Sequence, residues 1–84
     1  MESSYWFYIL YSSSLDRYYV GSTGNISDRL KRHNAGRSRY TRAGLPWELI
    51  HSEKFETRSA AYRRERYVKS QKSRPFLEKL IKGS

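Results

Sequence analysis

The sequence predicts a small α+β fold, in which a three-stranded antiparallel sheet is flanked by helices in the order β-β-α-β-α-α. The prediction rests on an aromatic and apolar run that is followed by a polar turn and a second strand-like run. A third strand-like run lies mid-chain, and three other stretches combine helix-start signals with helical spacing. The chain has 84 residues, enough for one domain over residues 1–84. A domain this small needs a compact core, and 15% of the residues are aromatic.

The first half of the chain predicts a β-hairpin and a helix. Residues 6–11 form a run that is too short for an ordinary helix and rich in strand formers, which is typical of a strand buried on both faces. Residues 12–16 are polar and turn-like, and residues 17–23 form the returning strand. Asn25 is then well placed to cap a helix over residues 26–34.

The second half predicts a loop, a strand and two helices. Residues 36–45 are basic and show neither the strand period nor the helix period, so we expect a loop. Residues 47–55 predict the third strand. Thr57 is placed to cap a helix over residues 58–70. A helix-start signal at residues 73–75 and an apolar stripe after it predict a short last helix.

The charge of the chain indicates a polyanionic partner. Seventeen Lys and Arg residues against eight Asp and Glu residues give a net charge of +9. A basic field of this size favours nucleic acid, because binding to a phosphate backbone releases counterions. Small basic domains also include ribosome-associated and membrane-surface proteins, so charge alone does not indicate cleavage.

Several classes of protein are excluded or disfavoured by composition. The chain has no cysteine, which excludes a disulfide framework and a thiolate metal site. Its two histidines cannot by themselves form a structural zinc site, which takes four ligands. No apolar run approaches the ~18 residues of a transmembrane helix, and the first residues lack the basic region of a signal peptide. We therefore expect a cytoplasmic protein with no membrane partner and no organic cofactor.

Two polar side chains fall on the stripe of the first predicted helix that should face the sheet. Ile26, Arg29, Leu30 and His33 follow the spacing i, i+3, i+4, i+7. Either Arg29 and His33 belong to a functional site, or Arg29 extends its stem over the core and His33 is a satisfied, half-buried histidine. For either residue taken alone, the structural interpretation is the commoner one.

A carboxylate breaks the pattern of the second long helix in the same way. Glu65 is the only acid of that helix and shares a face with Ala61 and Val68. Glu is almost never buried without a partner. One interpretation is an ion pair with a neighbouring basic residue, for which Lys69 at i+4 is well placed. The other is a functional role, because an exposed ion pair does not require the inward face.

The hairpin carries two tyrosines and a glycine that fit the same site. We expect Tyr8 and Tyr19 to lie opposite one another, with both hydroxyls at one end of the sheet and facing the first helix. Gly21 would let a phosphate approach the backbone closely. Each tyrosine alone is typical of strand packing. Their joint spacing with the three polar helix residues predicts one pocket.

These residues resemble the motifs of the GIY-YIG nuclease family over about residues 6–72. The resemblance implies that Tyr8 is the tyrosine that ends the first family motif and that Tyr19 is the tyrosine of the second. Arg29 matches the invariant helix arginine, and His33 matches the position one turn later, where the family has His or Tyr. Glu65 matches the metal-binding glutamate. Residues 18–36 look especially like the small stand-alone members. Those members are related to the nuclease domain of the incision subunit of bacterial nucleotide excision repair.

The resemblance implies a metal-dependent endonuclease that hydrolyses phosphodiester bonds in nucleic acid, with DNA the expected substrate and repair or recombination the expected context. Glu65 would hold one Mg²⁺ or Mn²⁺ ion, and a single candidate carboxylate does not suit a two-metal arrangement. Arg29 would clamp the phosphate and stabilise charge in the transition state. Tyr8 would act as the base or orient the attacking water, with His33 relaying the proton and Tyr19 orienting the water or the phosphate.

Basic residues outside this pocket are expected to bind nucleic acid. The set comprises Lys31, Arg32, Arg37, Arg39, Arg42 and Lys69. In the predicted loop they interleave with Tyr40, which suits backbone contact combined with base stacking. A rival interpretation is a non-catalytic nucleic-acid-binding module that keeps the fold, and a third is a small adaptor for protein partners.

The chain departs from the family pattern at three points. The first motif keeps only its tyrosine, in the sequence Trp6-Phe7-Tyr8. Ser22 and Thr23 stand where some members carry a lysine after the second motif. No asparagine follows Asn34, although larger members often supply a late asparagine near the metal.

Overall fold

The computed structural model describes residues 4–36 and 39–83, apart from the side chains of Tyr40 and Thr41. The strands β1 (Tyr5–Ser12), β2 (Arg17–Thr23) and β3 (Trp47–Phe55) form one antiparallel sheet in the order β2-β1-β3. The long helices are α1 (Ile26–Asn34), α3 (Arg58–Gln71) and α4 (Arg74–Ile81). These elements confirm the predicted α+β class and order. The predicted loop contains one short helix, α2 (Arg39–Arg42). Within the described residues, no helix has the length and apolar character needed to cross a bilayer.

Each of the long helices begins at a polar capping residue. The Asn25 side chain accepts a hydrogen bond from the Asp28 N–H group at 3.0 Å, and Thr57 caps α3 through the Ala60 N–H group at 3.1 Å. Ser73 caps α4 in the same way. Such bonds satisfy N–H groups that have no partner within the helix itself. They fix where α1 and α3 start, and therefore which residues of each helix lie beside the sheet.

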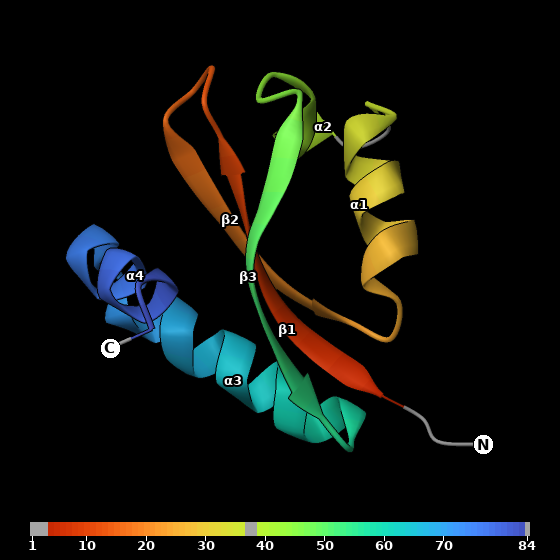
Figure 1. Cartoon of the computed structure of the whole chain (residues 1–84), viewed down its shortest axis with the longest axis vertical. Coiled ribbons are helices and arrows are strands. Elements are labelled where there is room, and N and C mark those ends of the chain that lie inside the picture. The colour runs from red at the N-terminus through yellow and green to blue at the C-terminus, as the bar shows by residue number, and fades with distance from the viewer. Residues whose placement is uncertain (1–3, 37–38, 84) are drawn as a thin grey trace.

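One face of the sheet is covered by α1, and we call it the α1 face (Figure 1). Tyr8 and Leu10 of β1 are buried there with Trp47 of β3. Ile26 and Leu30 of α1 pack against them. Because successive strand side chains point to opposite faces, every second residue of β1 faces α1.

The opposite face is covered by α3 and α4, and we call it the α3 face (Figure 1). Phe7 and Ile9 of β1 are fully buried there, beside Val20 of β2 and Val68 of α3. Apolar residues of α4 complete this cluster. The central strand β1 is thus buried on both sides from Phe7 to Leu10, as its apolar run predicts.

Asn34, the last residue of α1, ties that helix to β3. Its side-chain nitrogen donates to the Trp47 carbonyl oxygen at 3.0 Å, and its side-chain oxygen accepts from the Trp47 N–H group at 2.7 Å. A side chain that bonds both backbone groups of one residue fixes position and orientation together. Since α1 is a rigid element, this anchor also sets where Arg29 and His33 lie.

Candidate active site

The register of the hairpin places Tyr8 and Tyr19 on one face but not opposite each other. Tyr8 pairs with Gly21, and Tyr19 pairs with Leu10. The two tyrosines are therefore diagonal neighbours, and 6.4 Å separates their ring centroids. The prediction of direct pairing is wrong because the turn that joins Ser12 to Arg17 sets the register of every later pair. The predicted orientation towards α1 is confirmed.

Gly21 makes room for the hydroxyl of Tyr8. A Cβ atom built on Gly21 would lie 2.5 Å from the Tyr8 hydroxyl oxygen and 2.7 Å from Tyr8 Cζ. No side chain can occupy that space while the tyrosine is in place. The Tyr8 ring thus extends from β1 over β2, an outer strand of the sheet, so its hydroxyl reaches the sheet edge. We expected a phosphate to approach the backbone at Gly21, but the Tyr8 ring fills that space.

His33 is buried beside the two tyrosines and is 6% exposed. Its ring meets the Tyr19 ring edge-on at 4.7 Å between centroids and the Tyr8 ring at 6.5 Å. Burial, and secondarily the positive charge of Arg29, lower the pKa of His33 below its ordinary range. The imidazole is therefore neutral at pH 7 and has one ring nitrogen that can accept a proton.

The phenol of Tyr8 is held in its protonated form. Burial raises the pKa of Tyr8 well above its ordinary value, and the nearby Tyr19 and Glu65 raise it further, while Arg29 opposes them. At neutral pH this hydroxyl therefore donates hydrogen bonds. Of the two roles expected for Tyr8, orientation of a water molecule fits this environment better than direct action as a base.

Arg29 lies at the rim of the site instead of under it. Ile26, Leu30 and His33 face the sheet as the helical spacing predicts, but Arg29 is exposed, so its predicted place on the inward stripe is wrong. Helix α1 packs on β3, an outer strand of the sheet, so one side of its stripe is left to solvent. The guanidinium is still close enough to alter the pKa values of Tyr8 and His33.

Glu65 approaches the site from the α3 face. Ala61 and Val68 are buried as expected of the inward side of α3, and the Glu65 side chain between them is only 13% exposed. Its Oε1 atom accepts a hydrogen bond from the Ser22 hydroxyl at 2.6 Å. Its Oε2 atom accepts from Lys69 Nζ, also at 2.6 Å, which is the i+4 ion pair that the sequence allowed. Both carboxylate oxygens are thus engaged.

The site residues come from both sides of the sheet and meet around strand β2. Gly21 and Ser22 are consecutive, so they present opposite faces of the strand. Gly21 lies under the Tyr8 hydroxyl, and Ser22 bonds Glu65. The carboxylate is near enough to raise the pKa of Tyr8. An outer strand allows this arrangement, because a central strand would separate the two faces.

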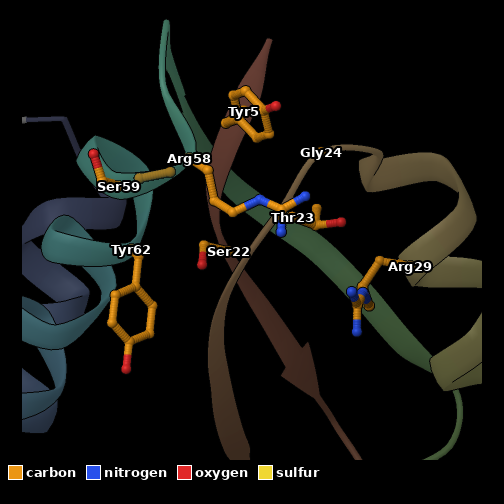
Figure 2. A pocket seen from close by; sticks show the side chains of 9 residues that line it. Tyr5, Ser22, Thr23, Gly24, Arg29, Arg58, Ser59 and Tyr62 are labelled. Atoms are coloured by element: carbon orange, nitrogen blue, oxygen red, sulfur yellow. The ribbon is translucent and has the colours of Figure 1, made fainter. Parts of the chain in front are cut away.

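A hollow of about 620 Å³ opens between the end of β2 and the start of α3 (Figure 2). Arg29 reaches it from α1, and Arg58 extends from α3 towards Thr23. The described residues that line it include two arginines and no acid: Tyr5, Ser22, Thr23, Gly24, Arg29, Arg58, Ser59, Ala61 and Tyr62. This volume is within the ~300–1,000 Å³ range of small-ligand pockets.

The predicted nucleic-acid-binding residues lie mostly on the surface. Lys31, Arg32, Arg39 and Arg42 are exposed. Arg32 pairs with Asp28 at 3.1 Å, and Arg42 Nε donates to the Gly36 carbonyl oxygen at 2.8 Å, so each also has a local partner. Arg37 and the side chain of Tyr40 lie outside the described residues. Lys69 is exposed but is held at Glu65.

Sequence reasoning missed Ser22 as a partner of Glu65 and missed Arg58 and Tyr62 as walls of the hollow. In the sequence, Ser22 stands out only because some family members carry a lysine at this point after the second motif. A signal for Arg58 was present, because it lies three residues before Ala61 and seven before Glu65 and so shares their helix face. Tyr62 is its i+4 neighbour. Extending the stripe of Ala61, Glu65 and Val68 by one turn towards the start of α3 would have identified Arg58 and its neighbour Tyr62.

Comparison with known proteins gives a consistent picture. The family model of the GIY-YIG catalytic domain matches residues 4–80. A UPF0213 protein of Natronomonas pharaonis is 39% identical over 82 residues, which cover 96% of this chain and 94% of that protein. A UPF0213 protein of Bacillus licheniformis is 44% identical over 68 residues, covering 80% and 69% of the two chains. The solution NMR structure of a UPF0213 protein of Bacillus halodurans superimposes with a TM-score of 0.60 at 31% identity, covering 94% of this chain and 83% of that one.

Proposed function

The chain belongs to the GIY-YIG catalytic domain family, and from this premise we propose that it is a metal-dependent endonuclease that hydrolyses phosphodiester bonds in DNA. The observation that carries the proposal is the meeting of a tyrosine hydroxyl, a neutral histidine, an exposed arginine and a nearly buried carboxylate around the outer strand β2. Each of these groups has a role in phosphodiester hydrolysis, and a purely structural sheet edge needs none of them.

The side chains divide the chemistry between them. Arg29 is exposed at the rim and binds the phosphate at the point where negative charge develops. The Tyr8 hydroxyl holds the attacking water, since burial keeps it a donor. His33 is neutral and packs against both Tyr8 and Tyr19, so it accepts the proton that the attack releases. Tyr19 orients the phosphate or the water beside it.

Glu65 would hold the metal ion, either Mg²⁺ or Mn²⁺. The groups at this point, a carboxylate and the Ser22 hydroxyl, are hard oxygen donors. Mg²⁺ is commonly held by one or two carboxylates and substrate phosphates while it keeps several waters. Within residues 4–36 and 39–83, no group of three or more His, Cys, Asp or Glu residues is placed to hold an ion, so the proposed site depends on Glu65 as its one carboxylate. The Lys69 ammonium at 2.6 Å is a positive charge already drawn to this carboxylate. When bound, the ion would neutralise negative charge on the phosphate.

The same ion pair supports a second candidate function. Because Lys69 and Ser22 engage both oxygens of Glu65, the carboxylate has the partners of a structural group as well. A non-catalytic nucleic-acid-binding module would keep this pair, the fold and the charge of +9. The two candidates make different predictions for the carboxylate and its lysine.

We expect Glu65→Gln to abolish cleavage while leaving the fold intact, because the amide removes the negative charge but keeps the size and the bond from Ser22. Wild type should nick supercoiled plasmid in Mg²⁺ or Mn²⁺ and not in EDTA. In parallel, Mn²⁺ binding is followed by the loss of the electron paramagnetic resonance signal of free Mn²⁺. Wild type should bind, and Glu65→Gln should not.

The matched control is Lys69→Ala, which breaks the same ion pair from its other side. It should still cut and should bind Mn²⁺ at least as tightly, since it removes a competing cation. If Glu65→Gln cuts like wild type, the metal site is wrong. If wild type binds DNA but cuts it with neither ion, the binding-module candidate replaces the nuclease.

A further inference from the structure

We propose that the hollow between β2 and α3 is a subsite for one unpaired nucleobase, next to the phosphate that is cut. The inference rests on the proposed function for the identity of that phosphate. It goes beyond it by naming the substrate class, which is DNA with a single-stranded or flipped nucleotide at the site of cleavage.

The position of the hollow puts it one step from the reaction. Arg29 lines it and is also the residue proposed to bind the phosphate. Ser22 also lines it, and its hydroxyl donates a hydrogen bond to Glu65. Ala61 lies one turn before Glu65 on the same face of α3. A nucleotide whose phosphate contacts Arg29 would therefore have its sugar and base at the mouth of this hollow.

The walls of the hollow suit a flat aromatic ligand. Tyr62 lies on the α3 wall and is 48% exposed, with Arg66 over its ring at 5.8 Å between the guanidinium carbon and the ring centroid (Figure 2). On another wall Arg58 covers the Tyr5 ring, with 5.7 Å between the guanidinium carbon and the ring centroid. Bases stack on tyrosine rings and on arginine planes, and every base has a face that can do so.

The charge of the lining selects a nucleotide over other flat ligands. Arg29 and Arg58 both reach the hollow, from α1 and α3, and none of its described lining residues is acidic. A phosphate alone would be satisfied by the two arginines and would need no exposed ring. An apolar ligand alone would need the ring but no arginine. A base joined to a phosphate uses both.

The base must be unpaired because a duplex does not present a free base face. In a helix each base is stacked on both sides, so contact with a side-chain ring requires unstacking or a strand that is already single. The hollow is partly open to solvent, so it can receive a base that swings out from a strand lying on the basic surface. Fully paired DNA would bind through its phosphates only.

The test compares two short single-stranded oligonucleotides, in EDTA so that no cutting occurs. One carries a single 2-aminopurine among abasic residues, and the other is abasic throughout. Wild type should bind the first about 5- to 150-fold more tightly, the range expected for one stacked base. The fluorescence of the 2-aminopurine should fall on binding, because stacking quenches it.

Three variants locate the contact. Tyr62→Ala should remove both the affinity difference and the quenching, whereas Tyr62→Phe should keep both, since the ring remains. Tyr67→Ala is the matched control, because Tyr67 is 51% exposed on the same helix but lies outside the lining of the hollow. Affinity for a duplex of the same length should be unchanged in all three.

If Tyr62→Ala keeps the difference and the quenching, the subsite does not exist. The same conclusion follows if wild type binds both oligonucleotides equally. Plasmid nicking is measured separately, so the two proposals fail separately. A protein that quenches 2-aminopurine but never cuts has the base subsite without the nuclease. One that cuts without distinguishing the oligonucleotides has the nuclease without the subsite.

Discussion

On its α3 face the sheet buries Phe7, Ile9 and Val20, side chains without a polar atom, whereas on its α1 face it buries the hydroxyl of Tyr8 and the imidazole of His33. The two faces belong to the same three strands, and the central strand contributes alternate residues to each. Burial of a polar group costs free energy unless it is compensated, and burial of an apolar group does not. Both faces therefore gain stability from apolar residues, since Leu10 and Trp47 are buried on the α1 face, but the α1 face loses part of that gain by also burying a hydroxyl and an imidazole.

Glu65 is the exception that connects the two faces. It lies on the α3 face, between the buried residues Ala61 and Val68, where it accepts a hydrogen bond from Ser22 of β2, and its carboxylate is near enough to raise the pKa of Tyr8 on the other face. Tyr8 and Ile9 make the contrast easiest to test, because they are neighbours in β1 and point to opposite faces. Changing one should alter stability, and changing the other should alter chemistry.

The largest effect is expected for Ile9→Ala. Ile9 is fully buried among apolar side chains, so its truncation leaves a cavity and should lower the free energy of unfolding by about 2–5 kcal/mol. Urea unfolding followed by tryptophan fluorescence measures this loss. The folded fraction should cut at the wild-type rate. A variant that keeps its stability but loses its cutting would show that the two faces are not separable.

Tyr8→Phe should have the opposite profile. It deletes one hydroxyl from the α1 face and should lower the single-turnover cleavage rate by about 10²–10³, the usual cost of removing one positioned donor. Binding to DNA, measured by fluorescence anisotropy, should stay near the wild-type value because basic residues supply the attraction. Its stability should change much less than that of Ile9→Ala. An equal loss of rate and affinity would make Tyr8 an ordinary packing residue.

The smallest effect is expected in the pH dependence of stability. The pKa of His33 is lowered from its ordinary 6.5, first by burial and then by Arg29. Because the unfolded chain then binds more protons below that pH, the stability from a neutral His33 is complete above about pH 6.5 and is lost as the pH falls below it. Among the described residues, Tyr8 and Tyr19 contact the His33 ring, and Arg29 lies close enough for its charge to lower the pKa of His33.

His33→Tyr should reduce this loss of stability at acid pH, since tyrosine has no proton to gain there. Unfolding curves between pH 5 and pH 7.5 provide the measurement. His51→Gln is the control, because His51 of β3 packs against Phe7 on the α3 face and pairs with Glu53. If His51→Gln reduces the loss of stability at acid pH and His33→Tyr does not, His33 is not the histidine responsible for that loss.

Local patterns predicted the elements of this fold because each depends on a few adjacent residues. The N-caps Asn25 and Thr57 bond the N–H groups three residues on, and they lie where the sequence places them. The inward stripe of α3 was likewise visible in the spacing of Ala61, Glu65 and Val68. Helix α2 escaped prediction, since four residues are too few to show a helical period.

The parts that could not be predicted depend on distances between elements. The register of Tyr8 against Gly21 follows from the geometry of the turn, which the sequence of the strands does not contain. The exposure of Arg29 depends on α1 packing on the outer strand β3, which the sequence of α1 does not contain. The bond from Ser22 to Glu65 joins residues 43 positions apart and needs both α3 and β2 in place. These tertiary relations decide the details of the candidate site.

The contact between Gly21 and Tyr8 also restricts how this chain can evolve. A Cβ atom at position 21 would meet the Tyr8 hydroxyl oxygen at 2.5 Å, so any larger residue there does not fit while Tyr8 keeps its position. A substitution at position 21 therefore requires a change at position 8 as well. Substitutions at positions 8 and 21 are therefore coupled. A descendant that no longer needs Tyr8 is released from both constraints at once, and a bulky residue at position 21 would mark the loss.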